Sequence, residues 1–151
     1  MSILDKALTA AHAEVKAEIA RTDTKTGLLL AFVGALLAGI WSVASDVRLP
    51  VAAYVVGGLG VLLLLAAAAL LLRAVRPNLG GRRPHGFPLW ATQTAQEITT
   101  GLSEDTRAQD IASLSRLAVT KYVALRRAVD LTRVAGALLV IAAVIGIGGA
   151  L

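Results

Sequence analysis

The sequence contains no cysteine, which excludes disulfide bonds, thiolate metal sites and cysteine nucleophiles. It contains only two histidines, His12 and His85, and they lie far apart in the chain. Catalytic and metal-binding sites need several reactive groups in a fixed geometry. We therefore expect no metal site, no cofactor and no enzymatic activity.

Charged residues are also few. They make up 17% of the chain, whereas hydrophobic residues make up 56%, and an average soluble domain carries about 25% charged residues. The net charge of +5 could suggest nucleic acid as a partner, but aromatic residues are only 4% of the chain. The Lys and Arg residues are concentrated beside hydrophobic segments, as the positive-inside rule requires of membrane proteins. The composition predicts a lipid bilayer as the environment and no nucleic-acid partner.

Three charge-free segments are long enough to cross a bilayer, which takes roughly 20 helical residues. They cover residues 27–45, 51–72 and 134–151 and have lengths of 19, 22 and 18 residues. The sequence therefore predicts an all-α membrane protein with three transmembrane helices.

The distribution of Lys and Arg predicts how these helices are oriented. The stretch from Arg73 to Arg133 carries ten of the 15 Lys and Arg residues, whereas the connector between the first two spans carries only Arg48. By the positive-inside rule the N-terminus faces the cytoplasm and the C-terminus lies outside. The predicted order is a cytoplasmic helix (1–26), a transmembrane hairpin (27–72), a basic loop (73–102), a second cytoplasmic helix (103–133) and the third span (134–151).

Both cytoplasmic helices are predicted to be amphipathic and to run directly into a span. The second has its start signal at Ser103, a helix-capping residue followed by Glu104 and Asp105. Apolar residues recur every three or four positions, which is the period of one helix face. These residues are Leu4, Leu8, Ala11, Val15 and Ile19 in the first helix and Ile111, Leu114, Ala118, Tyr122, Leu125 and Val129 in the second. Two such helices cannot each bury an apolar face alone, so they should pack on each other or on another subunit. With the spans, they leave more apolar surface than one chain can cover, and we expect a homo-oligomer. Glycines in the spans allow close contacts, either within one chain or between subunits.

Charged groups gather where the first and third spans leave the membrane. On a helical wheel Thr22 and Thr26 continue the first apolar stripe, and Asp23 and Lys25 border it. Matched by distance from the spans, Asp23 is expected near the level of residues 126–133. Two interpretations remain open for this region: a membrane anchor in which Asp23 pairs with a cation of the third helix, or a site for a small anionic ligand. In the second interpretation arginine binds phosphate, an aromatic ring stacks on a base and Asp23 accepts a hydrogen bond.

The stretches ARTDTKTGLLLAFVGALLAG (20–39) and SLSRLAVTKYVALRRA (113–128) resemble the transmembrane effectors of bacterial Pycsar anti-phage systems. The resemblance implies a protein of the bacterial inner membrane that is activated by a cyclic pyrimidine mononucleotide, cyclic CMP or cyclic UMP. Once active, it impairs the membrane and halts growth of the infected cell. Asp23 and Lys25 match the family's Asp-x-Lys motif, and Lys121 and Tyr122 match its late Lys-Tyr pair. With Arg126 these residues form the expected ligand site.

A ligand-independent membrane scaffold, which binds a partner through its cytoplasmic helices, is the alternative. A small multidrug-type transporter is disfavoured because no span carries the carboxylate that such coupling uses. A nucleotide cyclase gene beside this one would favour the effector over the scaffold.

Overall fold

The computed structural model contains five helices within the residues that it describes, which are 3–46, 49–76, 87–103 and 105–148. No strand occurs within these ranges. The helices are α1 (Ile3–Asp46), α2 (Val51–Val75), α3 (Phe87–Trp90), α4 (Ala95–Ser103) and α5 (Arg107–Gly148). Three of them, α1, α2 and α5, are long and apolar enough to cross a membrane. The prediction of an all-helical chain with three such helices is confirmed.

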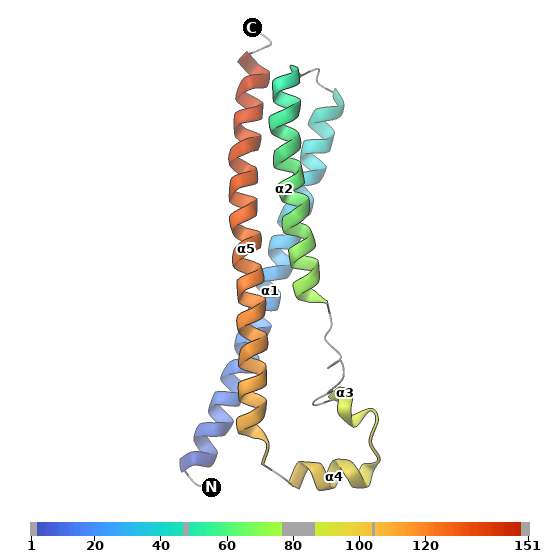
Figure 1. Ribbon diagram of the computed structural model, residues 1–151, viewed down its shortest axis with the longest axis vertical. Helices are drawn as coiled ribbons and strands as arrows, with labels where there is room; N and C mark the ends of the chain where they lie inside the picture. The colour runs from blue at the N-terminus through green and yellow to red at the C-terminus, as the bar shows by residue number, and fades with distance from the viewer. Residues whose placement is uncertain (1–2, 47–48, 77–86, 104, 149–151) are drawn as a thin grey trace.

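Helix α2 lies along its whole length beside about half of α1 and of α5, with α1 and α5 parallel and α2 running the opposite way (Figure 1). The remaining halves of α1 and α5 continue together beyond the end of α2, while α3 and α4 lie away from the bundle. Each of α1 and α5 is a single unbroken helix in which a polar half continues into an apolar half. We call the end of the bundle at which α2 ends, with Arg73 and Arg76, the basic end.

Two small apolar clusters fix how the three helices are aligned along the length of the bundle. Ala67 and Leu71 of α2 pack with Leu125 and Ala128 of α5, nearest to the basic end. Farther from that end, Val33 of α1 and Leu64 of α2 pack with Ala135 of α5. Residues of the two clusters such as Leu64, Leu71 and Val33 are fully buried, so these contacts fix which levels of the helices face each other.

Gly60 of α2 lies at a close approach between α2 and α5. A Cβ atom at this position would lie 3.0 Å from Cγ of Leu139 and 3.2 Å from the carbonyl oxygen of Ala135. By contrast, a Cβ at Gly58 or Gly34 would meet nothing within 4 Å. The glycines of the spans therefore do not share one role, because Gly60 serves packing within the chain and Gly58 leaves an open surface.

The start of α5 differs from the position expected for the second cytoplasmic helix. Ser103 ends α4, and α5 begins at Arg107, where the backbone N–H of Arg107 donates a hydrogen bond to Oδ1 of Asp105 over 3.2 Å. Glu104 lies outside the described residues. Helix α4 itself falls in the segment predicted as a loop. It begins with a capping box, in which the Thr94 N–H donates to Oε2 of Glu97 over 2.7 Å and the Glu97 N–H donates to Oγ1 of Thr94 over 3.4 Å.

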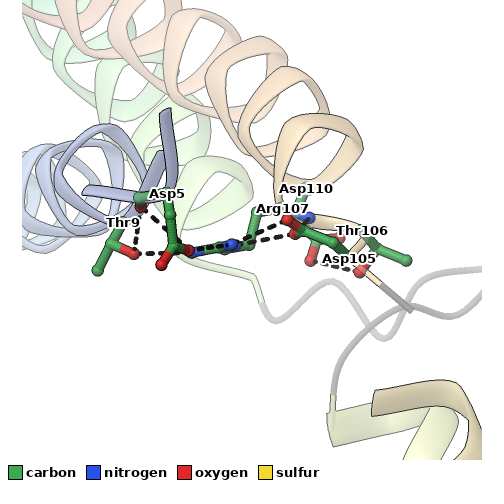
Figure 2. A network of polar contacts seen from close by, with 6 residues as sticks. All are labelled: Asp5, Thr9, Asp105, Thr106, Arg107 and Asp110. Atoms are coloured by element: carbon green, nitrogen blue, oxygen red, sulfur yellow. Dashed lines mark hydrogen bonds and ion pairs between the residues drawn. The ribbon is translucent and has the colours of Figure 1, made fainter. Parts of the chain in front are cut away.

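Arg107 joins the two ends of the extended helices farthest from the apolar clusters (Figure 2). Its Nη2 lies 2.5 Å from Oδ1 of Asp5 and 2.8 Å from Oδ2 of Asp105. Its Nη1 donates a hydrogen bond to Oγ1 of Thr9 over 2.8 Å. One guanidinium thus ties the beginning of α1 to the beginning of α5, which holds the two extensions together where α2 is absent.

Candidate functional site

A hollow of about 790 Å³ lies at the basic end, between the last turns of α2 and the middle of α5. Its walls are apolar where Leu70, Val75 and Leu117 face it. Its charged lining comes from three helices and consists of Asp23 of α1, Arg73 and Arg76 of α2, and Lys121 and Arg127 of α5.

Asp23 and Lys121 form an ion pair in this hollow. Nζ of Lys121 donates to Oδ1 of Asp23 over 2.6 Å, and the side chains are 18% and 45% exposed, respectively. The pair forms because Thr22 and Thr26, on either side of Asp23, are buried, which places Asp23 at the edge of the packed face of α1. Oγ1 of Thr26 donates to the carbonyl oxygen of Thr22 over 2.7 Å, so its buried hydroxyl is satisfied within the helix. The prediction that Thr22 and Thr26 continue the apolar stripe is confirmed.

The lining of the hollow is strongly cationic. Among the described residues four cations and one carboxylate line it, and that carboxylate, Asp23, is paired with Lys121. The arginines Arg73, Arg76 and Arg127 therefore give the hollow an excess of positive charge. Arginine donates paired N–H groups in a geometry that fits a phosphate, so the hollow has the chemistry of an anion site.

The structure brings together two of the five residues expected at the ligand site. Asp23 and Lys121 meet in the hollow, whereas Lys25, Tyr122 and Arg126 are exposed and do not line it. A ligand in the hollow can therefore reach these three side chains only if the helices rearrange or a neighbouring copy supplies them.

The level of Asp23 also differs from the expected one. Asp23 lies beside Lys121, not beside residues 126–133. Counting from the start of each apolar span gave the wrong level because the span of α5 begins deeper in the bundle than that of α1, as the contact between Val33 and Ala135 shows.

Sequence reasoning missed Arg73, Arg76 and Arg127 as lining residues of a common site. Arg73 and Arg76 follow the apolar stretch of α2 directly. Arginines in that position are as typical of a membrane anchor as of a ligand site. Whether Arg73 and Arg76 lie near Arg127 depends on which residues of α5 pack beside the end of α2. No local sequence pattern predicts that alignment of the two helices.

Other candidate sites are weaker. Within the described residues no group of three or more His, Cys, Asp or Glu side chains could hold a metal ion. A larger groove of about 1330 Å³ lies toward the opposite end, lined mostly by α1 and α2 with a few residues of α5, and its side chains include Phe32, Trp41 and Val55. This apolar lining is typical of helix surfaces in contact with acyl chains, so the hollow at the basic end is the better candidate for a polar ligand.

Comparison with known families finds a match for this chain. The family model of the Pycsar effector protein domain matches residues 7–148, which include both stretches that resemble this family and all the charged residues of the hollow. Comparisons with curated proteins and with solved structures find no match. Because the family match covers nearly the whole chain, the protein belongs to the Pycsar effector proteins and is a membrane effector of anti-phage defence.

Proposed function

We propose that a cyclic pyrimidine mononucleotide, cyclic CMP or cyclic UMP, binds in the hollow at the basic end and activates the protein to impair the bacterial inner membrane. The observation that carries this proposal is the Asp23–Lys121 pair, which lies among three arginines in a hollow of a Pycsar effector.

The chemistry of the ligand suits this lining. A cyclic mononucleotide carries one negative charge on its phosphodiester, which Arg73, Arg76 and Arg127 attract. The ligand also offers a sugar hydroxyl, and cytosine offers an exocyclic amine; both are donors for a carboxylate. Asp23 is the acceptor available to them, because one of its oxygens remains when Lys121 holds the other.

Lys25, Tyr122 and Arg126 remain predicted ligand residues in this proposal. Since they lie outside the hollow of one chain, we propose that they take part through a site shared between subunits of a homo-oligomer and not through a rearrangement of the helices within one chain. Binding would then favour the assembled form, because a ligand shifts a population only through its higher affinity for one state.

The proposal places the basic end in the cytoplasm, where the nucleotide is made. The chain has no cysteine of its own, so single cysteines report orientation cleanly. A membrane-impermeant thiol reagent applied to intact cells should label Ala44→Cys, near the opposite end, and should leave Ala10→Cys on the extension of α1 unlabelled. Labelling of Ala10→Cys without labelling of Ala44→Cys would show that the chain has the opposite orientation.

Binding is tested by calorimetry on the full-length protein in nanodiscs, with cyclic CMP and cyclic UMP as ligands. A hydrogen bond to a charged group contributes about 1.5 to 3 kcal/mol, and each 1.4 kcal/mol is about tenfold in affinity. Arg127→Gln and Arg73→Gln should therefore weaken binding by about tenfold or more. Arg116→Gln is the matched control, because Arg116 is exposed on the same helix but does not line the hollow.

Asp23→Asn separates two kinds of anion site. A site that recognises only the phosphate would tolerate the change or bind more tightly, whereas a site that also uses Asp23 for the base or sugar loses affinity. Release of a dye from liposomes that contain the protein then tests whether binding impairs the membrane. Binding without release would limit the proposal to recognition, and absence of binding would favour the ligand-independent scaffold.

A further inference from the structure

One face of α5 points away from the other two long helices and carries three charged residues. Arg126, Asp130 and Arg133 follow one another at spacings of four and three, which places them on a single helix face. The opposite face of α5 buries Ala128 and Ala135 against α2. Arg126, Asp130 and Arg133 are all exposed. We call this side, from Val119 to Arg133, the outer face of α5.

The contacts of the bundle show how deep these charges lie. Ala135 packs at the level of Leu64 and Val33. At 1.5 Å per helical residue, Leu64 lies about 12 Å inside the end of the apolar stretch of α2 at Leu72, and Val33 lies about 9 Å inside the start of that of α1 at Gly27. Arg133 comes two residues before Ala135, which places its backbone roughly 6 to 9 Å inside the apolar layer that α1 and α2 define.

The outer face is apolar where it leaves that layer. Val119, Tyr122 and Val123 are 63%, 52% and 43% exposed. Their level is that of Lys121, which pairs with Asp23, and Asp23 precedes the apolar stretch of α1 by about one helical turn. The outer face therefore exposes apolar side chains at the level of water and headgroups, whereas Asp130 and Arg133 place charged side chains within the apolar layer and Arg126 lies at its edge.

This pattern is the inverse of the one expected for a surface in contact with lipid and water. Charged residues within membrane spans almost always face protein or a water-filled cavity, and apolar patches outside the membrane mark protein contacts. A second copy of the chain accounts for both halves of the face. Copies inserted in the same direction and related by a twofold axis along the membrane normal present the same levels to each other.

We propose that the outer face of α5 is the contact face between two copies of this chain in the membrane. Val119, Tyr122 and Val123 pack against the same apolar patch of the other copy. Asp130 lies about one turn from an arginine on either side, so the carboxylate of each copy is within reach of the arginines of the other. The resulting contact keeps the charges away from acyl chains.

The proposed contact adjoins the hollow. Val119 and Val123 also line the hollow, so a second copy seated on the outer face would cover part of its lining. Tyr122 and Arg126, which lie outside the hollow of their own chain, would then stand at its rim.

Disulfide cross-linking of single-cysteine variants tests the contact in native membrane vesicles without nucleotide, so the result does not depend on the proposed ligand. Val119→Cys lies at one end of the outer face, and Val144→Cys lies beyond Arg133 on the same side of α5, about five helical turns after Arg126. Ala20→Cys on α1 and Leu62→Cys on α2 are controls on exposed surfaces of the other helices, with Leu62 and Val144 at 62% and 63% exposure. Oxidation should yield cross-linked dimer at Val119→Cys and Val144→Cys and little at the controls.

Charge variants then test the polar half of the face in the Val119→Cys background. Asp130→Arg should abolish most of the cross-linked dimer, and adding Arg133→Asp should restore it, because the second change returns a carboxylate to the face. Recovery in the double variant also shows that the chain still inserts and folds. The proposal would be overturned by equal cross-linking at all four positions, by stronger cross-linking at the controls, or by a yield of dimer that Asp130→Arg does not change. Lipid headgroups would then be the partners of these charges.

Discussion

The Asp23–Lys121 ion pair should stabilise the bundle by about 1 kcal/mol. Fully exposed pairs contribute roughly 0.2 to 1 kcal/mol, and hydrogen bonds to charged groups contribute about 1.5 to 3 kcal/mol when they are well shielded. This pair is intermediate, because the atoms are 2.6 Å apart and the Lys121 side chain is 18% exposed, but the Asp23 side chain is 45% exposed. Solvent screening at Asp23 therefore keeps the value near the top of the range for exposed pairs.

A double-mutant cycle measures this coupling directly. Asp23→Asn, Lys121→Met and the combined variant are compared with the wild-type protein by thermal unfolding in detergent, monitored by helical circular dichroism. A change of 1 kcal/mol corresponds to about 2 to 4 °C in a chain of this size. The effect of the double variant should be smaller than the sum of the single effects by about 1 kcal/mol. Independent sites add to within about 0.3 to 0.5 kcal/mol, so additivity within that margin would refute a coupled pair.

Three further predictions concern other parts of the chain. Gly60→Ala should destabilise the bundle by about 1 to 3 kcal/mol, because the added Cβ meets Leu139 and a backbone oxygen of α5; Gly58→Ala, which meets nothing within 4 Å, should show no loss in the same unfolding assay. Hydrogen bonds from the side chain and the backbone of Arg107 lower the pKa of Asp105 from 3.8 to about 2. The ionised Asp105 carboxylate therefore contributes its full stabilisation above about pH 3.8 and loses it as the pH falls toward 2. The difference in free energy of unfolding between wild type and Asp105→Asn should be constant above about pH 5 and vanish in acid. A difference that persists at pH 2 would contradict this assignment. Thr94→Ala removes the capping box of α4 and should raise amide hydrogen exchange in residues 95–99 without changing the unfolding temperature of the bundle; a drop in that temperature would show that α4 stabilises the bundle.

The sequence predicted the parts of the structure that depend on local pattern. The continuity of α1 and α5 follows from apolar periodicity without an interrupting proline. The position of Asp23 at the edge of a buried face follows from its neighbours Thr22 and Thr26. Helix α4 was missed because the Gly- and Pro-rich stretch before it indicated a loop, although Thr94 and Glu97 have the spacing of a capping box.

The composition of the hollow could not be predicted in the same way. It depends on the level at which the antiparallel α2 meets α5, and that level is set by long-range packing such as the approach of Gly60 to Leu139. A shift of one helical turn would move Arg73 and Arg127 apart by about 5.4 Å. For the same reason the partner of Asp23 was expected among residues 126–133 and is instead Lys121.

The proposed ligand of this Pycsar effector is a cyclic pyrimidine mononucleotide bound in the hollow at its basic end. The most direct measurement is calorimetric titration of the wild-type protein in nanodiscs with cyclic CMP and cyclic UMP, with cyclic AMP as the purine control and inorganic phosphate as the bare anion. We expect saturable binding of a cyclic pyrimidine nucleotide and weaker binding of cyclic AMP and inorganic phosphate. Arg127→Gln should weaken the binding of the pyrimidine nucleotide by about tenfold or more, and Arg116→Gln should leave it unchanged. Absence of binding of both pyrimidine nucleotides, or equal binding of all four ligands, would contradict the claim.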